Sequence, residues 1–264
     1  MFELREKDKV KYLVITEFED TNLVNHCFST RIGGVTKGEA GTLNFGFGRK
    51  DTRENVIENF KIICKTINVD FEKLVLTDQV HDNKVYKVTE DDVGKGIMRE
   101  SDIKCIDALV TNVPQIPIVT FHADCIPVFF LDPVKKAIGL AHSGWKGTYS
   151  NISKNVVEKM GVEYGTLPSD LICGIGPSIM QCHFEVGDDV AKMFEERYGN
   201  KFVVIRNKPH IDLTAIVEKQ LRECGVKNIV QSNICTYCNN DIYYSYRGDN
   251  HKTGSLISVM ALKG

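Results

Sequence analysis

The stretch IPIVTFHADCIPVFFLDPVKKAIGLAHSGWKGT, residues 116–148, decides the fold prediction. It holds three apolar runs separated by short polar segments, and runs of this length with β-branched and aromatic residues predict strands. Similar runs predict further strands outside this stretch, at residues 11–16, 73–80, 84–89 and 108–112. The chain is therefore expected to be rich in β-structure.

Four amphipathic segments predict helices. The first begins at Asp51, whose side chain is expected to cap the first turn, and the second follows Gly147. Two more are expected at residues 186–199 and 212–225. Because the strands come in runs instead of alternating strictly with helices, we predict an α/β fold of the α+β kind, with helices packed on a mixed or antiparallel sheet. No linker or repeat divides the chain, so one domain is expected over residues 1–264.

The composition narrows the class of partner. Thirty-three basic and 35 acidic residues give a net charge of -2, and the pI is near 6.4. This balance argues against nucleic acid or an anionic membrane surface and favours a small neutral or anionic substrate. The sequence shows no secretory or membrane-spanning segment, and its nine cysteines lack the spacing of a secreted disulfide scaffold. We therefore expect a cytoplasmic protein with reduced thiols.

Three residues with metal-binding side chains follow or precede apolar runs. These are His81 after LVLTDQV, Cys125 before IPVFFLD and His142 after AIGLA. Side chains at the ends of neighbouring strands can meet over one edge of a sheet. Two imidazoles and a thiolate are suitable zinc ligands, and three protein ligands leave a fourth position for water or substrate. The sequence thus predicts a catalytic zinc site, although a histidine or cysteine at a strand end is more often simply packed or hydrogen-bonded.

Other residues near this stretch have two interpretations. Asp124, next to Cys125, is a candidate proton shuttle or a turn carboxylate that caps backbone groups. His122 is expected near the site. The CTYC segment, with Cys235 and Cys238, has the spacing of half a zinc ribbon or a redox pair, but no second CxxC completes it, so a packing role is favoured.

Basic residues beside glycine are candidate phosphate ligands, because glycine lets backbone N–H groups approach an anion. The candidates are Arg31 in STRIGG, Lys146 in GWKGT and Arg247 in YSYRG. The glycine-rich segment of residues 30–48 is long enough to be a binding loop. Such residues are also common as solvated loop charges.

The segments together resemble a known family. The blocks that carry the resemblance are HCFSTRIGGVTKG, TLNFGFG, TDQVHDNKVYKV, DALVTN, ADCIPV, AHSGWKGT, GIGPSI with CHFEVG, and NICTYC with YYSYRG. In this order, from about residue 26 to the end, they look like the blocks of the YfiH or laccase-domain family of multicopper polyphenol oxidoreductase-like proteins.

The resemblance implies a single-domain layered α/β sandwich, related in architecture to Cys/His toxin deamidases. It implies a metal held by His81, Cys125 and His142, and adds Asn44 of TLNFGFG to the substrate- and phosphate-binding candidates. The implied activity is zinc-dependent purine nucleoside phosphorylase, with adenosine deaminase and S-methyl-5'-thioadenosine phosphorylase activities in the same site. The implied partners are purine nucleosides, such as adenosine, inosine and guanosine, and phosphate. The sequence assigns no oligomeric state.

The chain departs from the family pattern at a few positions. Lys146 stands where the family usually has arginine, which keeps a cation but loses the bidentate fork. His122 replaces a small polar residue, and Gly248 and Ser255 stand where arginines are expected. These changes bear mainly on the phosphate ligands.

The number of histidines limits the kind of metal site that the chain can form. A blue-copper oxidase with a trinuclear cluster needs about ten histidines, largely in H-x-H pairs, whereas this chain has seven and no such pair. A four-copper polyphenol oxidase is therefore disfavoured, although two histidines and a cysteine can bind a single copper ion. The alternatives to the phosphorylase are a metal-free Cys/His amidohydrolase with Cys125 as nucleophile, a peptidoglycan-precursor editing enzyme, and a binding protein without turnover.

Overall fold

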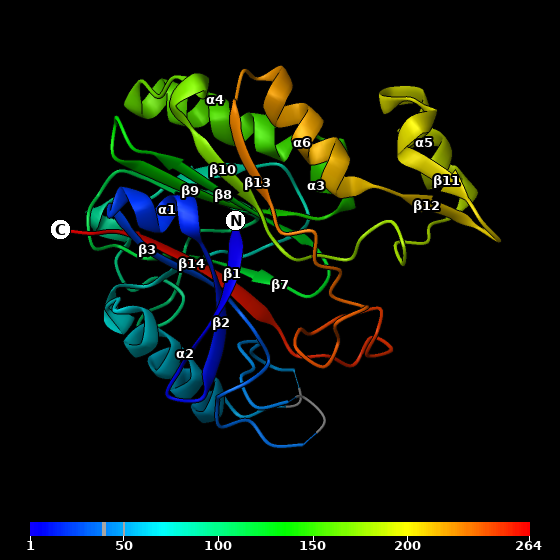
Figure 1. Cartoon of the computed structure of the whole chain (residues 1–264). Coiled ribbons are helices and arrows are strands. Elements are labelled where there is room, and N and C mark those ends of the chain that lie inside the picture. The colour runs from blue at the N-terminus through cyan, green and yellow to red at the C-terminus, as the bar shows by residue number, and fades with distance from the viewer. Residues whose placement is uncertain (39–40, 50) are drawn as a thin grey trace.

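The computed structural model describes residues 1–38, 41–49 and 51–264, and shows two six-stranded mixed sheets (Figure 1). The first sheet has the order β1 (Phe2–Lys7), β2 (Val10–Ile15), β3 (Val24–Ser29), β14 (Leu256–Leu262), β7 (Ile118–His122) and β4 (Val75–Leu76). The second has the order β13 (Asn228–Gln231), β10 (Ile172–Ile175), β8 (Ile126–Asp132), β9 (Ala137–Ser143), β6 (Ala108–Thr111) and β5 (Val85–Lys87). A hairpin of β11 (Val203–Ile205) and β12 (Pro209–Ile211) stands apart from both.

Helices cover the outer faces of the sheets. The α-helices are α1 (Thr16–Thr21), α2 (Arg53–Ile67), α3 (Trp145–Tyr149), α4 (Ile152–Tyr164), α5 (Asp188–Tyr198) and α6 (Leu213–Glu223). Short 3-10 helices span Phe71–Lys73, Glu90–Asp92, Pro168–Asp170 and Asn200–Phe202. In Figure 1, α4 and α6 lie on one side of the sheets and α2 on the other. This layered arrangement confirms the predicted α/β fold with mixed sheets.

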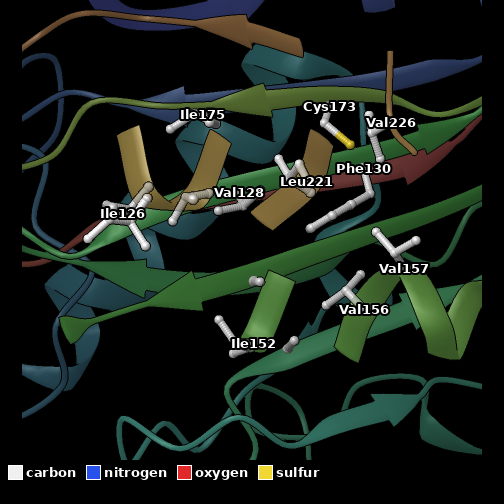
Figure 2. Close-up of a cluster of buried hydrophobic side chains, with 14 of the residues drawn as sticks. Ile126, Val128, Phe130, Ile152, Val156, Val157, Cys173, Ile175, Leu221 and Val226 are labelled. Carbon is white, nitrogen blue, oxygen red and sulfur yellow. The ribbon is translucent and has the colours of Figure 1, made fainter. Parts of the chain in front are cut away.

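The alternation of side chains along β8 explains the layers. Val128 and Phe130 point to the helix side, where they pack in one cluster with residues of α4 and α6, as Figure 2 shows. Phe129 and Leu131 point the other way, into the core between the two sheets. Because successive side chains of a strand face opposite sides, a strand with apolar residues at every position must be buried on both faces. A third cluster packs α2 against the outer face of the first sheet.

Several local predictions need correction. The strand expected over residues 73–80 is only β4, because the chain then turns away into a loop. The cap of α2 is Thr52, whose hydroxyl accepts a hydrogen bond from the Asn55 N–H, while Asp51 binds the Asn55 side chain. The loop expected over residues 30–48 contains neither helix nor strand where it is described, and residues 39 and 40 lie outside the described residues. None of the described helices is long and apolar enough to cross a membrane.

We predict that Phe130→Ala lowers the free energy of unfolding by about 3–5 kcal/mol, because the fully buried ring fills the interface between β8 and the helices. Urea unfolding measures this change. Val162→Ala, at a position 83% exposed on α4, is the control and should change the value by less than about 0.5 kcal/mol. Equal effects of the two substitutions would contradict the packing described here.

Candidate active site

Two of the predicted metal ligands meet at one end of the β8–β9 hairpin. Cys125 directly precedes β8, and His142 is the penultimate residue of β9, where it pairs with Pro127. The connection from β7 to β8 crosses from the first sheet to the second, so Cys125 stands where the two sheets are joined. The hairpin register thus fixes the backbones of both residues.

His81 reaches the same point from a loop instead of a strand end, which corrects the expected placement. The loop joins β4 to β5, and the backbone of His81 is left-handed, with φ of 63°. This conformation is uncommon for a residue other than glycine and persists only where the surroundings enforce it. Here the conformation is held by hydrogen bonds to one buried carboxylate.

The Asp107 carboxylate holds this loop and His142 together. It accepts hydrogen bonds from the backbone N–H groups of Val80, His81 and Asp82, at 3.0, 3.0 and 2.9 Å. It also accepts one from Nδ1 of His142 at 2.8 Å. Asp107 is fully buried directly before β6, and its carbonyl accepts the His142 N–H. Because Nδ1 is engaged by this carboxylate, Nε2 is the nitrogen that can bind a metal, once it has given up its proton.

The ligand atoms of His81, Cys125 and His142 lie within 4.8 Å of one another. The two imidazole rings stand nearly perpendicular, with centroids 4.8 Å apart. Gly144 makes this approach possible: a Cβ at its position would lie 2.7 Å from Cδ2 of His81 and 3.2 Å from Sγ of Cys125. The space that a side chain would fill is thus used by two of the three donors. The donor set and its open side fit a metal ion such as zinc.

Charge is concentrated on Cys125 and His142. Burial acts to raise the pKa of the Cys125 thiol, but the charge of His142 and hydrogen bonding from both histidines outweigh it and lower the pKa to about 6. Burial acts to lower the pKa of His142, yet the Cys125 thiolate and Asp107 raise it to about 9. Burial also opposes ionisation of Asp107, but His142 and the loop N–H groups keep its pKa below the ordinary value. Without metal the site therefore holds a thiolate–imidazolium pair.

The ring of His122 packs against the ring of His142. Its ring centroid lies 5.5 Å from that of His142, its Nε2 is 2.8 Å from Oγ1 of Thr120, and its Nδ1 is 3.2 Å from the Cys125 carbonyl oxygen. Burial, followed by the charge of His142, lowers the pKa of His122 well below its ordinary value. It is a neutral, fully engaged ring that packs against a ligand.

Asp124 is engaged in the same way. One carboxylate oxygen accepts from the Thr236 hydroxyl and the other from the Arg247 backbone N–H, both at 2.7 Å. Its carbonyl accepts from the Ile179 N–H, and its φ is 85°. Asp124 also lines the pocket described below, so its interpretations as a proton shuttle and as a turn carboxylate both stay predictions. Its contacts tie the turn before Cys125 to two distant loops.

The three donors open into a pocket of about 620 Å³, within the range of small-molecule sites. Aromatic residues form much of its wall: Phe47, Phe121, Trp145, Phe184 and Tyr246. Two guanidinium side chains, of Arg49 and Arg247, also line it. The pocket therefore combines flat apolar surfaces with positive charge beside a candidate metal site.

Of the four predicted substrate- and phosphate-binding residues, only Arg247 lines this pocket in the described chain. Arg31 donates to the carbonyl of Asn240 and lies over the ring of Tyr244, away from the lining. Lys146 is exposed, and its ammonium lies 5.6 Å from the Trp145 ring centroid.

Asn44 does not line the pocket, but it holds two residues that do. It is fully buried, and its side-chain oxygen accepts from the N–H groups of Gly46 and Ser255, both at 2.9 Å. Both of these partners line the pocket. Asn44 therefore positions two lining residues without itself lining the pocket.

Two residues of the site were not found from the sequence. Arg49, in GFGRK, has the glycine neighbour that singled out the other basic residues, so the same criterion could have included it. Asp107 has a weaker signal, a lone carboxylate directly before the apolar run ALVT. A charge beside a fully buried strand needs partners, but those partners lie 25 to 35 residues away.

The chain is similar to known proteins. Residues 25–263 match the model of the family described as multi-copper polyphenol oxidoreductase laccase. This chain belongs to that family. The purine nucleoside phosphorylase YlmD of Bacillus subtilis (strain 168) is 33% identical over 264 residues, which cover 95% of this chain and 94% of the relative.

Solved structures of the family share the fold. The hypothetical protein YfiH from Bacillus licheniformis has a TM-score of 0.90 and 31% identity, over 98% of this chain and 99% of its own. YlmD from Geobacillus stearothermophilus has a TM-score of 0.91 and 26% identity, with 100% of each chain covered. The layered arrangement of the family member described here is thus also that of these two proteins.

We predict that metal-free protein is alkylated at Cys125 with a rate that rises with pH through a midpoint near 6, because the thiolate is the reacting form and its pKa is lowered to about 6. For an ordinary thiol, the midpoint of this profile would lie at a pH of about 8.5. Iodoacetamide labelling followed by peptide mass spectrometry measures the profile, with the exposed Cys105 as the internal reference. A Cys125 midpoint above pH 8 would show that the ion pair does not form.

We predict that Asp107→Asn lowers the free energy of unfolding by about 1–2 kcal/mol, because the amide NH₂ faces partly buried N–H groups that lose their acceptor. Zinc affinity should fall about 10- to 100-fold, since His81 and His142 lose their support. Urea unfolding and competition with a chromogenic chelator measure the two effects.

The matched control is Asp82→Asn, which removes a charge from the same loop at a carboxylate whose partners, among the described residues, are the Asn83 N–H and Lys84. It should leave both values nearly unchanged. The proposed role of Asp107 would be rejected by parallel behaviour of the two variants.

Proposed function

We propose that this protein is a zinc-dependent purine nucleoside phosphorylase that also deaminates adenosine and phosphorolyses S-methyl-5'-thioadenosine. The observation that carries the proposal is the open cluster of His81, Cys125 and His142 in a pocket that has aromatic walls and two arginines. The relative named purine nucleoside phosphorylase, which covers nearly the whole chain, supports the same activity.

His81, Cys125 and His142 would hold the zinc ion. When bound, zinc supplies a Lewis acid beside the substrate. The protein's own contribution is to fix the donors: Asp107 orients His142 and the His81 loop, and Gly144 leaves the space in which His81 and Cys125 approach each other. Three protein donors would leave the zinc ion open to water or substrate, as in catalytic and not structural zinc sites.

The aromatic walls suit a purine nucleoside. A planar base stacks on aromatic side chains with a gain of about 1–3 kcal/mol per base. Phe121 and Trp145 stand in the lining next to the metal donors, and Phe47, Phe184 and Tyr246 complete the aromatic set. The same apolar surface would suit the methylthio group of S-methyl-5'-thioadenosine.

Arg49 and Arg247 would bind phosphate. A Cβ at Gly46 would lie 2.8 Å from both Cδ of Arg49 and Oγ of Ser255, so the Arg49 side chain lies beside Ser255. Ser255 stands where the family resemblance leads one to expect arginine, and Arg49 supplies a guanidinium at that place. Guanidinium groups bind phosphate through paired hydrogen bonds.

Asp124 acts as a positioning residue in this proposal. Its carboxylate holds the backbone of Arg247 and the Thr236 hydroxyl, and both of its oxygens are engaged. It would therefore fix the phosphate ligand more than carry protons for deamination.

A second candidate function is a metal-free Cys/His amidohydrolase. In this function Cys125 would be the nucleophile, His142 the base and Asp107 the carboxylate that orients the base. The lowered pKa of Cys125 makes the thiolate the populated form near neutral pH. This function is the alternative outcome of the experiment below.

The experiment uses protein as isolated, chelator-treated protein, and chelator-treated protein reconstituted with zinc or copper. Each is incubated with inosine, adenosine or S-methyl-5'-thioadenosine, with and without phosphate. We expect ribose 1-phosphate from inosine only when phosphate and zinc are present, and inosine from adenosine without phosphate. Turnover by metal-free protein that is lost on alkylation of Cys125 would overturn the zinc proposal and favour the amidohydrolase.

We predict that Arg247→Ala raises KM for phosphate about 10-fold or more with a smaller effect on KM for inosine, because it removes a phosphate ligand but keeps the backbone N–H that binds Asp124. Initial rates at varied phosphate measure this. Lys146→Ala is the control, since this exposed cation lies outside the pocket lining, and it should keep the wild-type KM. A phosphate KM unchanged by Arg247→Ala would remove this residue from the phosphate site.

A further inference from the structure

A second group of metal-binding side chains lies outside the pocket. It consists of Cys182, His183, Cys235 and Cys238, and their ligand atoms lie within 4.8 Å of one another. Cys182 and His183 come from the loop between β10 and α5, whereas Cys235 and Cys238 are the cysteines of the CTYC segment after β13. The sequence favoured a packing role for CTYC because no second CxxC exists. The structure completes the set with an adjacent cysteine and histidine instead.

The distances match those of a tetrahedral zinc site. Zinc–sulfur bonds of about 2.3 Å and zinc–nitrogen bonds of about 2.0–2.1 Å require about 3.8 Å between two sulfurs and about 3.6 Å between sulfur and nitrogen. Sγ of Cys182 and Sγ of Cys238 are 3.8 Å apart. Nδ1 of His183 lies 3.2, 3.9 and 3.3 Å from the sulfurs of Cys182, Cys235 and Cys238.

These distances do not fit the alternatives of a disulfide or simple packing. A disulfide brings its sulfurs to about 2.05 Å, far closer than the 3.8 Å between Cys182 and Cys238. Buried cysteines that serve as small hydrophobes, such as Cys173, lie within an apolar cluster. Here three thiols converge on one imidazole nitrogen, and Cys238 is exposed.

The geometry points to a second zinc site, in which Cys182, Cys235 and Cys238 bind through Sγ and His183 through Nδ1. We propose that this site is closed and structural, because four protein ligands fill the tetrahedron and leave no position for substrate. The ring of Tyr237 stacks on that of His183, with centroids 4.0 Å apart and an angle of 15° between the planes. This contact fixes the orientation of the imidazole that the metal needs.

The second site would lock one wall of the pocket. The two ligand-bearing loops already meet at a bridge between Ser178 and Cys235. Thr236, between the ligand cysteines, donates to Asp124, and Phe184, next to His183, lines the pocket. A zinc ion that joins the loops therefore holds residues that contact the pocket without itself reaching the substrate.

The test measures zinc per chain by inductively coupled plasma mass spectrometry after growth in zinc-supplemented medium. Cys125→Ser protein, in which the first site is disabled, should keep one zinc per chain, and X-ray absorption should show three sulfurs and one nitrogen around it. This result does not depend on nucleoside phosphorylase activity or on zinc in the first site. A Cys125→Ser protein without zinc, or with fewer than three sulfur ligands per zinc, would overturn the proposal.

Variants of the exposed ligand separate metal loss from misfolding. Adding Cys238→Ser to Cys125→Ser should remove the remaining zinc and lower Tm, whereas adding Cys238→His should retain the metal because imidazole can replace the thiolate. Cys105→Ser, at an exposed thiol outside both groups, is the control and should keep the zinc count of its parent. Retention of zinc after Cys238→Ser, or a Cys182–Cys238 disulfide in freshly purified protein, would contradict the site.

Discussion

The Asp107 carboxylate is the interaction on which the rest of the site depends. Four hydrogen bonds converge on its two oxygens, three from the backbone of the His81 loop and one from His142. Burial of a charge is tolerated only when such partners compensate for the loss of water. The same bonds force His81 into a left-handed backbone and set the tautomer of His142. Metal ligation and loop conformation are therefore consequences of one buried charge.

The sequence predicted the central strands and the longer helices well, because their apolar periodicity is local. It missed β1, whose charged segment FELREK lies at a sheet edge, and β14, which is buried on both faces and shows no alternation. The convergence of His81, Cys125 and His142 was predicted from ligand chemistry and strand ends. Asp107 and the Cys182–His183 pair were not, because their importance arises from contacts between distant loops that no local pattern encodes.

The pocket is formed by a rigid β-hairpin and by loops. The β8–β9 hairpin supplies rigidity through its register, while the loops that carry Arg49, Phe184 and Arg247 supply the surfaces that contact a ligand. Asp124 connects the two, since it precedes Cys125 and holds Arg247 and Thr236. A rigid scaffold with variable loops lets one fold bind different ligands.

The place of β14 in the first sheet has a consequence for biosynthesis. This strand, made of residues near the end of the sequence, lies between β3 and β7 and pairs with both. On the ribosome, the edges of β3 and β7 that pair with β14 stay unpaired until residues 256–262 have left the exit tunnel. Ordering of the segment that leads into Cys125 is thus coupled to pairing with a strand that is translated much later.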